Sequence, residues 1–351
     1  MKHPERWRYS AVLLVLILAL AASMLAGLAI GSIAIPPGEV VRTLGHHLAP
    51  GLVDGSGSTH VDTVVVQVRA PRVVLGAVVG AGLAVVGMTL QALVRNPLAD
   101  PYLLGVSSGA SVGAVGVLVT GTTFLGVAST SVAAFVGALG ALALVYALSR
   151  AGGRITTTRL VLAGVAVAYV LSAVTSLMLL LADSGDRARQ VLTWLLGGLG
   201  GAHWDALWLP LGAVLVGLVA LLAHARTLNV LLAGDEAAIT MGVDVDRFRA
   251  QTFVVASLLT GVLVAVSGPI GFVGLIMPHA VRLLVGGDHR RSLPAAALTG
   301  AAFLVVADLA ARTVASPQEI PVGVLTALCG GPFFLWLIRR DARRAVAGGV
   351  A

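Results

Sequence analysis

Lysine is almost absent from this chain of 351 residues, since Lys2 is the only one. The Walker A loop, Gly-x-x-x-x-Gly-Lys-Ser/Thr, needs a lysine that reaches the phosphates of a nucleotide, and it cannot occur here. The chain is therefore not a P-loop ATPase itself. If it takes part in active transport, either an ion gradient or a separate ATPase subunit must supply the energy.

Cysteine and charge are also scarce. Cys329 is the only cysteine, so neither a disulfide nor a cysteine-based metal site can form within one chain, and we expect it to be a small core residue. Charged residues make up 11% of the chain and hydrophobic residues 58%, whereas a soluble domain has about 25% and about 45–50%. The composition predicts an all-α, polytopic membrane protein with membrane lipid as a partner. No metal, cofactor or catalytic residue is expected.

Ten apolar segments have about the length that a helix needs to cross the roughly 30 Å hydrocarbon core of a bilayer. They are 11–33, 70–94, 99–120, 125–149, 159–182, 205–223, 250–267, 271–285, 294–315 and 321–338. The first is too long for the apolar region of a signal peptide, so we expect it to span the membrane. The second has Pro71 in what we expect to be its first turn. No soluble domain interrupts the series, and we expect one membrane domain over 1–351.

The distribution of arginine predicts the orientation, because the cytoplasmic loops of membrane proteins carry most of the Lys and Arg residues. With the N-terminus inside, 17 of the 23 basic residues fall on the cytoplasmic side and the other 6 on the opposite side. We therefore expect both termini and the loop 224–249 to be cytoplasmic. The arginines are dispersed between apolar segments and form no basic face, so nucleic acid is not an expected partner.

A polar segment with two prolines, 95–101, separates two of the apolar runs and contains Asn96, Pro97 and Pro101. Lipid cannot satisfy the backbone groups that a broken helix leaves free, so such a segment must be buried in protein, line a wet cavity or lie at the interface. We expect it to belong to a transport pathway.

The loop 224–249 contains the pattern of a short helix. Asp235 and Glu236 follow Gly234, and acidic residues are favourable in a first helical turn. Gly242 is placed to end the helix. Its apolar face would present Ala237, Ala238 and Met241, which suits docking into a groove of a partner protein. An amphipathic helix lying on the membrane surface is the alternative.

Two motifs allow a catalytic or metal-binding interpretation. Residues 105–109 match Gly-x-Ser-x-Gly, the nucleophile elbow of hydrolases, and His279 could serve as a base in an intramembrane serine protease. An elbow needs a strand before the serine, whereas these flanks are apolar helices, so helix packing is the favoured interpretation. His279 stands alone beside Pro278, which favours a structural role over metal binding. Asp308 is the only clear acidic candidate for ion coupling, so a separate motor subunit is favoured.

Six segments, in this order, resemble those of FecCD-type permeases, the membrane subunits of type II ABC importers for ferric siderophores, haem and cobalamin. They are 69–72, 95–110, 194–201, 234–242, 268–279 and 320–326, which include Pro269 and Pro321. The resemblance covers the chain from its first span to Arg340. It implies ten spans per subunit, in agreement with the count from apolar runs.

The resemblance also implies partners and a location in the bacterial cytoplasmic membrane. The permease would pair with itself or with a homologous permease, and two ATP-binding cassette subunits would bind its cytoplasmic face. A periplasmic or lipid-anchored binding protein would deliver the substrate. In this family the loop that resembles 234–249 forms coupling helices that enter a groove on the ATPase.

Further roles follow from the same resemblance. Arg69, Arg72 and Arg312 occupy positions whose arginines pair with glutamates of the binding protein, and a lipid-headgroup anchor is the alternative. Thr157 and Thr158 resemble the inner gate, for which helix capping is the alternative. A ferric siderophore is the expected substrate because it is the commonest in the family, and haem or cobalamin are the alternatives.

Overall fold

The computed structural model describes residues 3–31, 33–49, 51, 58–150 and 156–348, and among them every regular element is a helix. The elements in chain order are α1 His3–Ala29, α2 Pro37–Leu48, α3 Thr59–Asp62, the π-helix η1 Thr63–Arg69, α4 Ala70–Val94, the 3₁₀ turn η2 Pro101–Leu104, α5 Val106–Thr120, the 3₁₀ turn η3 Gly126–Ala128, α6 Ser129–Ser149, α7 Thr157–Leu180, α8 Gly185–Leu195, α9 Trp204–Ala223, α10 Ala225–Leu232, α11 Asp235–Thr240, α12 Val245–Ser267, α13 Val273–Val285, α14 His289–Thr313 and α15 Val322–Gly348.

Seven helical segments within the described residues are long and apolar enough to cross a membrane, and three more helices are apolar but shorter. The shorter helices are α5, α13 and the first part of α15. Together they follow the ten expected spans in order. The all-α, polytopic fold is therefore confirmed, with seven clear spans.

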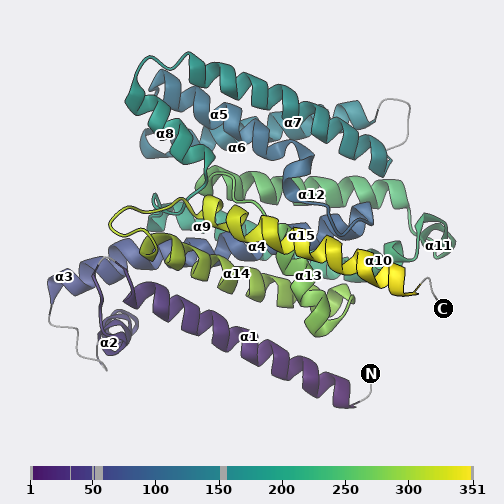
Figure 1. Cartoon of the computed structure of the whole chain (residues 1–351), viewed down its shortest axis with the longest axis horizontal. Helices are drawn as coiled ribbons and strands as arrows, with labels where there is room; N and C mark the ends of the chain where they lie inside the picture. Colours follow the sequence, from purple (N-terminus) through teal and green to yellow (C-terminus); the bar gives the residue numbers. More distant parts are fainter. Residues whose placement is uncertain (1–2, 32, 50, 52–57, 151–155, 349–351) are drawn as a thin grey trace.

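Helix α4 lies at the centre of the molecule. It packs against α14, α13, α12, α9 and α1, and 83% of its most apolar stretch is buried. Figure 1 shows α5, α6 and α7 on one flank of this centre and α1 on the other. The contact with α14 is close because Gly80 and Gly300 face each other, and a methyl group on either would overlap the carbonyl of the other. Small residues allow this approach between helix backbones.

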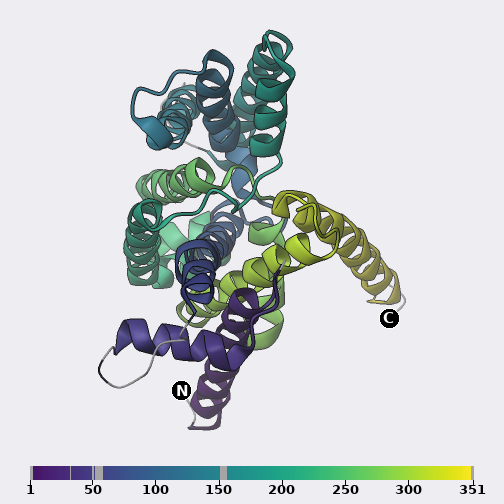
Figure 2. The ribbon, with the colours of Figure 1, turned by 90° about the vertical axis from the view of Figure 1, so that its left-hand side faces the viewer.

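Different helices and loops lie at the two ends of the molecule. The first described residues, the last ones and α11 all lie at one end, which we call the α11 end (Figure 1). The loop between α14 and α15 and helices α2 and α3 lie at the opposite end. Figure 2 shows α15 leaning away from the rest of the molecule, and its contacts are with α13 and α14. Cys329, expected in the core, is exposed on this helix.

Several helix boundaries differ from those expected. The second span does not begin at Pro71, because α3 and the π-helical turn η1 run directly into α4 and give one segment, Thr59–Val94. Helices α12 and α14 each begin five residues early, where Asp244 and Asp288 cap them through their side chains. Helices α2, α8 and α10 were not expected from the apolar runs.

Candidate functional site

Asp235, the first residue of α11, joins three elements at the α11 end. Its carboxylate accepts hydrogen bonds from Arg249 of α12, whose Nη2 lies 3.1 Å from each oxygen. It also pairs with Arg95 at the end of α4, with 3.2 Å between Nη2 and Oδ1. Arg249 is 3% exposed, so its charge depends on this carboxylate, because a buried charge without a partner is costly. We call these three residues the Asp235 clamp.

The position of Arg95 follows from how α4 ends. Arg95 adopts a left-handed conformation with φ of 53°, and the N–H of Asn96 closes the turn on Gln91 O at 3.1 Å. The Asn96 side chain accepts the N–H of Leu98 at 2.9 Å, and the chain then passes Pro97 and enters η2 at Pro101. The expected break in the helix is confirmed, and its free backbone groups are met by local hydrogen bonds.

Helix α11 has the bounds that the sequence predicts. Gly234 and Gly242 flank it with φ of 110° and 81°, values that glycine adopts without strain. Glu236, Ile239 and Met241 are exposed, whereas Ala237 is partly buried and Ala238 is completely buried. The exposed surface here therefore comprises Glu236, Ile239, Thr240 and Met241 and, unlike the expected apolar face, does not include Ala238. Docking of this helix on a partner stays a prediction.

A crevice of about 550 Å³ connects α11 with the start of α7. It is lined by Arg95, Thr156, Thr158, Asp235, Ile239, Val243, Asp244, Val245, Asp246 and Arg249. Thr156 caps α7, since its Oγ1 accepts the N–H of Arg159 at 3.4 Å, so capping does not require Thr158, which is exposed. Thr157 is the first residue of α7, and its side chain lies outside the described residues.

Two helix breaks meet inside the bundle. Helices α5 and α13 have 15 and 13 residues, which is about 20 Å of helix and too short for the hydrocarbon core. Gly274, in the first turn of α13, lies against Pro101, and a methyl group on it would be 3.0 Å from Pro101 Cδ. The carbonyl of Gly274 accepts Gln91 Nε2 of α4 at 3.2 Å. The polar segment after α4 thus reaches the break before α13.

Three further breaks meet at the opposite end. The N–H of Gly198 donates to Ser267 O at 2.8 Å, and the N–H of Gly323 donates to Gly197 O at 3.3 Å. Gly197 has φ of 70°, and a methyl group on it would overlap the carbonyl of Pro269. Three of the six sequence segments, 194–201, 268–279 and 320–326, therefore come together although they are far apart in the chain.

The other residues singled out from the sequence lie within helices or directly before them. Pro321 directly precedes α15, and Pro278 lies inside α13. His279 packs edge-on against Phe333 of α15, with 6.1 Å between ring centroids. Ser107 is buried in the first turn of α5 and follows a 3₁₀ turn instead of a strand, so the geometry of a nucleophile elbow is absent there. Within the described residues, no three His, Cys, Asp or Glu side chains are grouped as metal ligands.

Two of the three arginines expected to dock a binding protein are buried. Arg69 is 5% exposed and Arg312 is 8% exposed. Arg69 Nη1 donates to the carbonyls of Leu28 and Ala29 in α1 at 2.7 and 3.0 Å, and Arg312 Nη2 donates to that of Gly27 at 3.1 Å. Arg69 and Arg312 therefore do not form an exposed rim of arginines. Their side chains bind the carbonyl groups at the end of α1.

Asp308 is the centre of an ion-pair network at this end. Its carboxylate accepts hydrogen bonds from Nε and Nη2 of Arg72 at 3.0–3.1 Å. It also pairs with Arg312, whose Nε lies 3.1 Å away. Arg72 also pairs with Glu319, with 2.8 Å between Nη1 and Oε2, and the Glu319 side chain is 52% exposed. Asp308 is therefore committed to two arginines, which argues against ion coupling. Docking of a binding protein on the arginines stays a prediction, and Arg72 is the one with an exposed partner.

The chain matches known proteins over nearly its whole length. The model of the FecCD transport family matches residues 15–340. The cobalamin import system permease protein BtuC of Halobacterium salinarum is 51% identical over 283 residues, 81% of this chain and 75% of that protein. The hemin transport system permease protein HmuU of Yersinia pestis is 43% identical over 279 residues, 78% and 83% of the two chains.

A solved structure has the same fold. It is an inward-facing conformation of a metal-chelate type ABC transporter, with a TM-score of 0.82 and 31% sequence identity. The match covers 94% of this chain and 99% of that one.

Replacing Asp308 by Asn should destabilise the protein strongly. The change keeps the size of the side chain but leaves the buried Arg312 without its carboxylate, and Arg72 with Glu319 alone, a loss of about 3–5 kcal/mol. The matched control is Asp183→Asn, which breaks an exposed pair with Arg187, where the Asp183 side chain is 69% exposed, and should cost about 0–1 kcal/mol. Thermal unfolding of the purified chain in detergent measures both. Equal losses would show that the network contributes no more than a surface pair.

Proposed function

The chain belongs to the FecCD transport family, and we propose that the substrate it carries across the membrane is a metal tetrapyrrole, cobalamin in the first place. It is a multi-pass membrane protein and the permease subunit of an ABC importer. The ATPase activity lies in a partner subunit, and such importers also work with a substrate-binding protein.

The relatives carry the substrate proposal. The permease that is 51% identical is named for cobalamin import, and the one that is 43% identical is named for hemin transport. Cobalamin and haem both hold a metal ion in a macrocycle derived from a tetrapyrrole. They have more support than the ferric siderophore expected from the sequence, and haem is the second candidate.

Uptake by cells tests the substrate. The chain is expressed with its ATPase and binding protein in cells that lack cobalamin uptake, and radiolabelled cobalamin, haem and a ferric siderophore are supplied separately. We expect saturable uptake of cobalamin that stops when the ATPase is inactivated. Uptake of the siderophore alone would contradict the tetrapyrrole proposal while leaving the importer intact.

The α11 end is the side that we propose to face the cytoplasm and the ATPase. The exposed Ile239 and Met241 give α11 an apolar surface, with Glu236 beside them. A helix with apolar side chains projecting from a polar loop fits a groove on a partner protein. The Asp235 clamp then connects the docked helix to α4 and α12.

The start of α7 lies across the crevice from this clamp, since Thr158 and Asp235 line it together. We infer a dimer of this chain, or of it with a homologous permease, in which Thr157 and Thr158 of both copies close the path at the α11 end. Small side chains suit such a closure, because two-fold symmetry brings identical residues together at one axis. Two ATPase subunits would serve the two copies of α11.

Replacing Ile239 by Arg should uncouple the permease from its ATPase. The new charge would lie in an apolar groove, and loss of a central apolar contact weakens an interface by about tenfold or more. We expect less ATPase in co-purification and less ATP hydrolysis, with unchanged thermal unfolding of the permease alone.

The matched variant is Ala238→Leu, one residue away. Ala238 is completely buried, so the larger side chain should lower the thermal stability of the permease itself. Normal ATPase binding and uptake by the Ile239→Arg protein would show that α11 is only a surface helix.

A further inference from the structure

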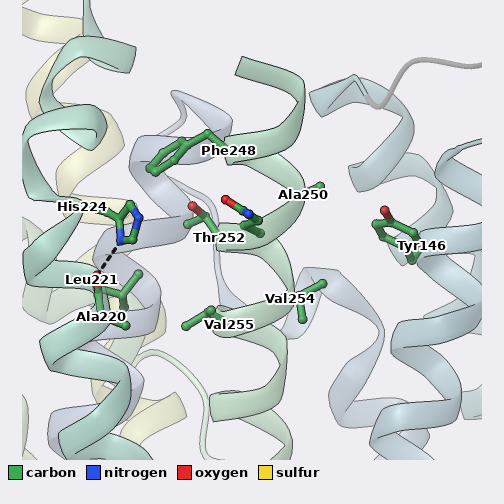
Figure 3. A pocket seen from close by; sticks show the side chains of 10 residues that line it. Tyr146, Ala220, Leu221, His224, Phe248, Ala250, Thr252, Val254 and Val255 are labelled. Carbon is green, nitrogen blue, oxygen red and sulfur yellow. Dashed lines mark hydrogen bonds between the residues drawn. The ribbon is translucent and has the colours of Figure 1, made fainter. Parts of the chain in front are cut away.

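A crevice between α6, α9 and α12 shares no lining residue with the crevice beside α11. It holds about 510 Å³ and is lined mainly by apolar side chains (Figure 3). We propose that it binds an anionic phospholipid of the leaflet at the α11 end. An acyl chain occupies the crevice, and the phosphate lies beside Arg150, Arg226 and Arg247.

The lining of the crevice is mainly apolar, and its polar side chains are Tyr146, His224, Gln251 and Thr252. It consists of Tyr146, Ala220, Leu221, His224, Phe248, Ala250, Gln251, Thr252, Val254 and Val255. His224 terminates α9, with its Nδ1 2.8 Å from the carbonyl oxygen of Ala220, and its ring lies 5.8 Å from that of Phe248. Figure 3 shows Tyr146 on the facing wall, on α6. The volume lies within the range of about 300–1,000 Å³ that small-molecule sites occupy.

The surface around the crevice is apolar and exposed. Leu144 of α6 is 46% exposed, Val216 of α9 is 70% exposed and Leu258 of α12 is 37% exposed. All three belong to helices that are long and apolar enough to cross the membrane. A crevice that opens among such side chains is filled by acyl chains, since they are what surrounds an apolar spanning surface.

An exposed arginine lies next to each of the three walls in the chain, at the α11 end. Arg150 caps α6 and follows Tyr146 by four residues, and Arg247 in the first turn of α12 precedes Gln251 by four, so each of these two shares a face with a lining residue. Arg226 follows His224 by two residues and lies in the first turn of α10. Within the described part of the chain, the side chains of these arginines take part in no ion pair.

The carboxylates that precede Arg247 in the chain belong to another part of the surface. Asp244 and Asp246 line the other crevice, beside Thr158, and Asp244 caps α12 by accepting the N–H of Arg247 at 3.0 Å. Three arginines at the boundary of an apolar crevice suit a lipid with a net negative headgroup, because basic clusters next to a span attract anionic lipids. The long arginine side chains can reach the headgroup level from the helix ends.

Native mass spectrometry of the purified full chain tests the proposal with two lipids of equal chain length, phosphatidylglycerol and phosphatidylcholine. We expect the wild-type chain to retain phosphatidylglycerol at least tenfold better. Val255→Trp should remove this retention by filling the crevice, whereas Leu215→Trp, which is 55% exposed on the side of α9 away from the lining residues Ala220 and His224, should retain it. Thermal unfolding of both variants checks that they are folded.

The triple variant Arg150→Gln, Arg226→Gln, Arg247→Gln changes only exposed side chains and should remove the preference between the two lipids. Equal retention of both lipids by the wild-type chain would overturn the role of the headgroup. Unchanged retention in Val255→Trp would place the lipid elsewhere. If Val255→Trp instead breaks a dimer without changing lipid retention, a second copy covers the crevice and the lipid proposal fails.

Discussion

The carboxylate of Asp235 is the contact on which the α11 end depends. Helix α11 has six residues, too few to be stable alone, because forming the first turn of a helix is unfavourable. Its position is set by the ion pairs to Arg95 and Arg249 and by the burial of Ala238. We infer that a force applied to the exposed side of α11 reaches α4 and α12 through this carboxylate.

Broken helices impose the second constraint. Backbone groups freed inside a bilayer must find partners within the protein, and here they do so where breaks meet. Gly274 O accepts Gln91, and Gly197 O accepts the N–H of Gly323. Contacts this close need glycine, as the overlap that a methyl group on Gly197 would produce with Pro269 demonstrates. Part of the glycine content thus serves the meeting of interrupted helices, and part serves close helix packing such as that of Gly80 with Gly300.

The sequence predicts the parts of this structure that local patterns determine. Apolar length predicts the ten helices, and Gly234 and Gly242 predict the bounds of α11. The helical segment that precedes Pro71 and runs into α4 was not predicted, because a π-helical turn has no recognisable sequence pattern. Burial of Arg69 and Arg312 was missed because counting charges assigns arginines to loops, whereas carbonyls at the end of α1 and Asp308 satisfy them. The Asp235 clamp joins residues up to 154 positions apart, beyond the reach of any local motif.

Asp235 is the residue through which, we infer, the state of the ATPase reaches the gate. Disulfide cross-linking between copies that carry Thr158→Cys in a Cys329→Ala background, in the complex with the ATPase, measures it with and without nucleotide. With Asp235 present, the cross-linked fraction should change with nucleotide, and Asp235→Asn should abolish that change while the ATPase still co-purifies. A nucleotide-dependent change of the same size in the Asp235→Asn protein would contradict the account.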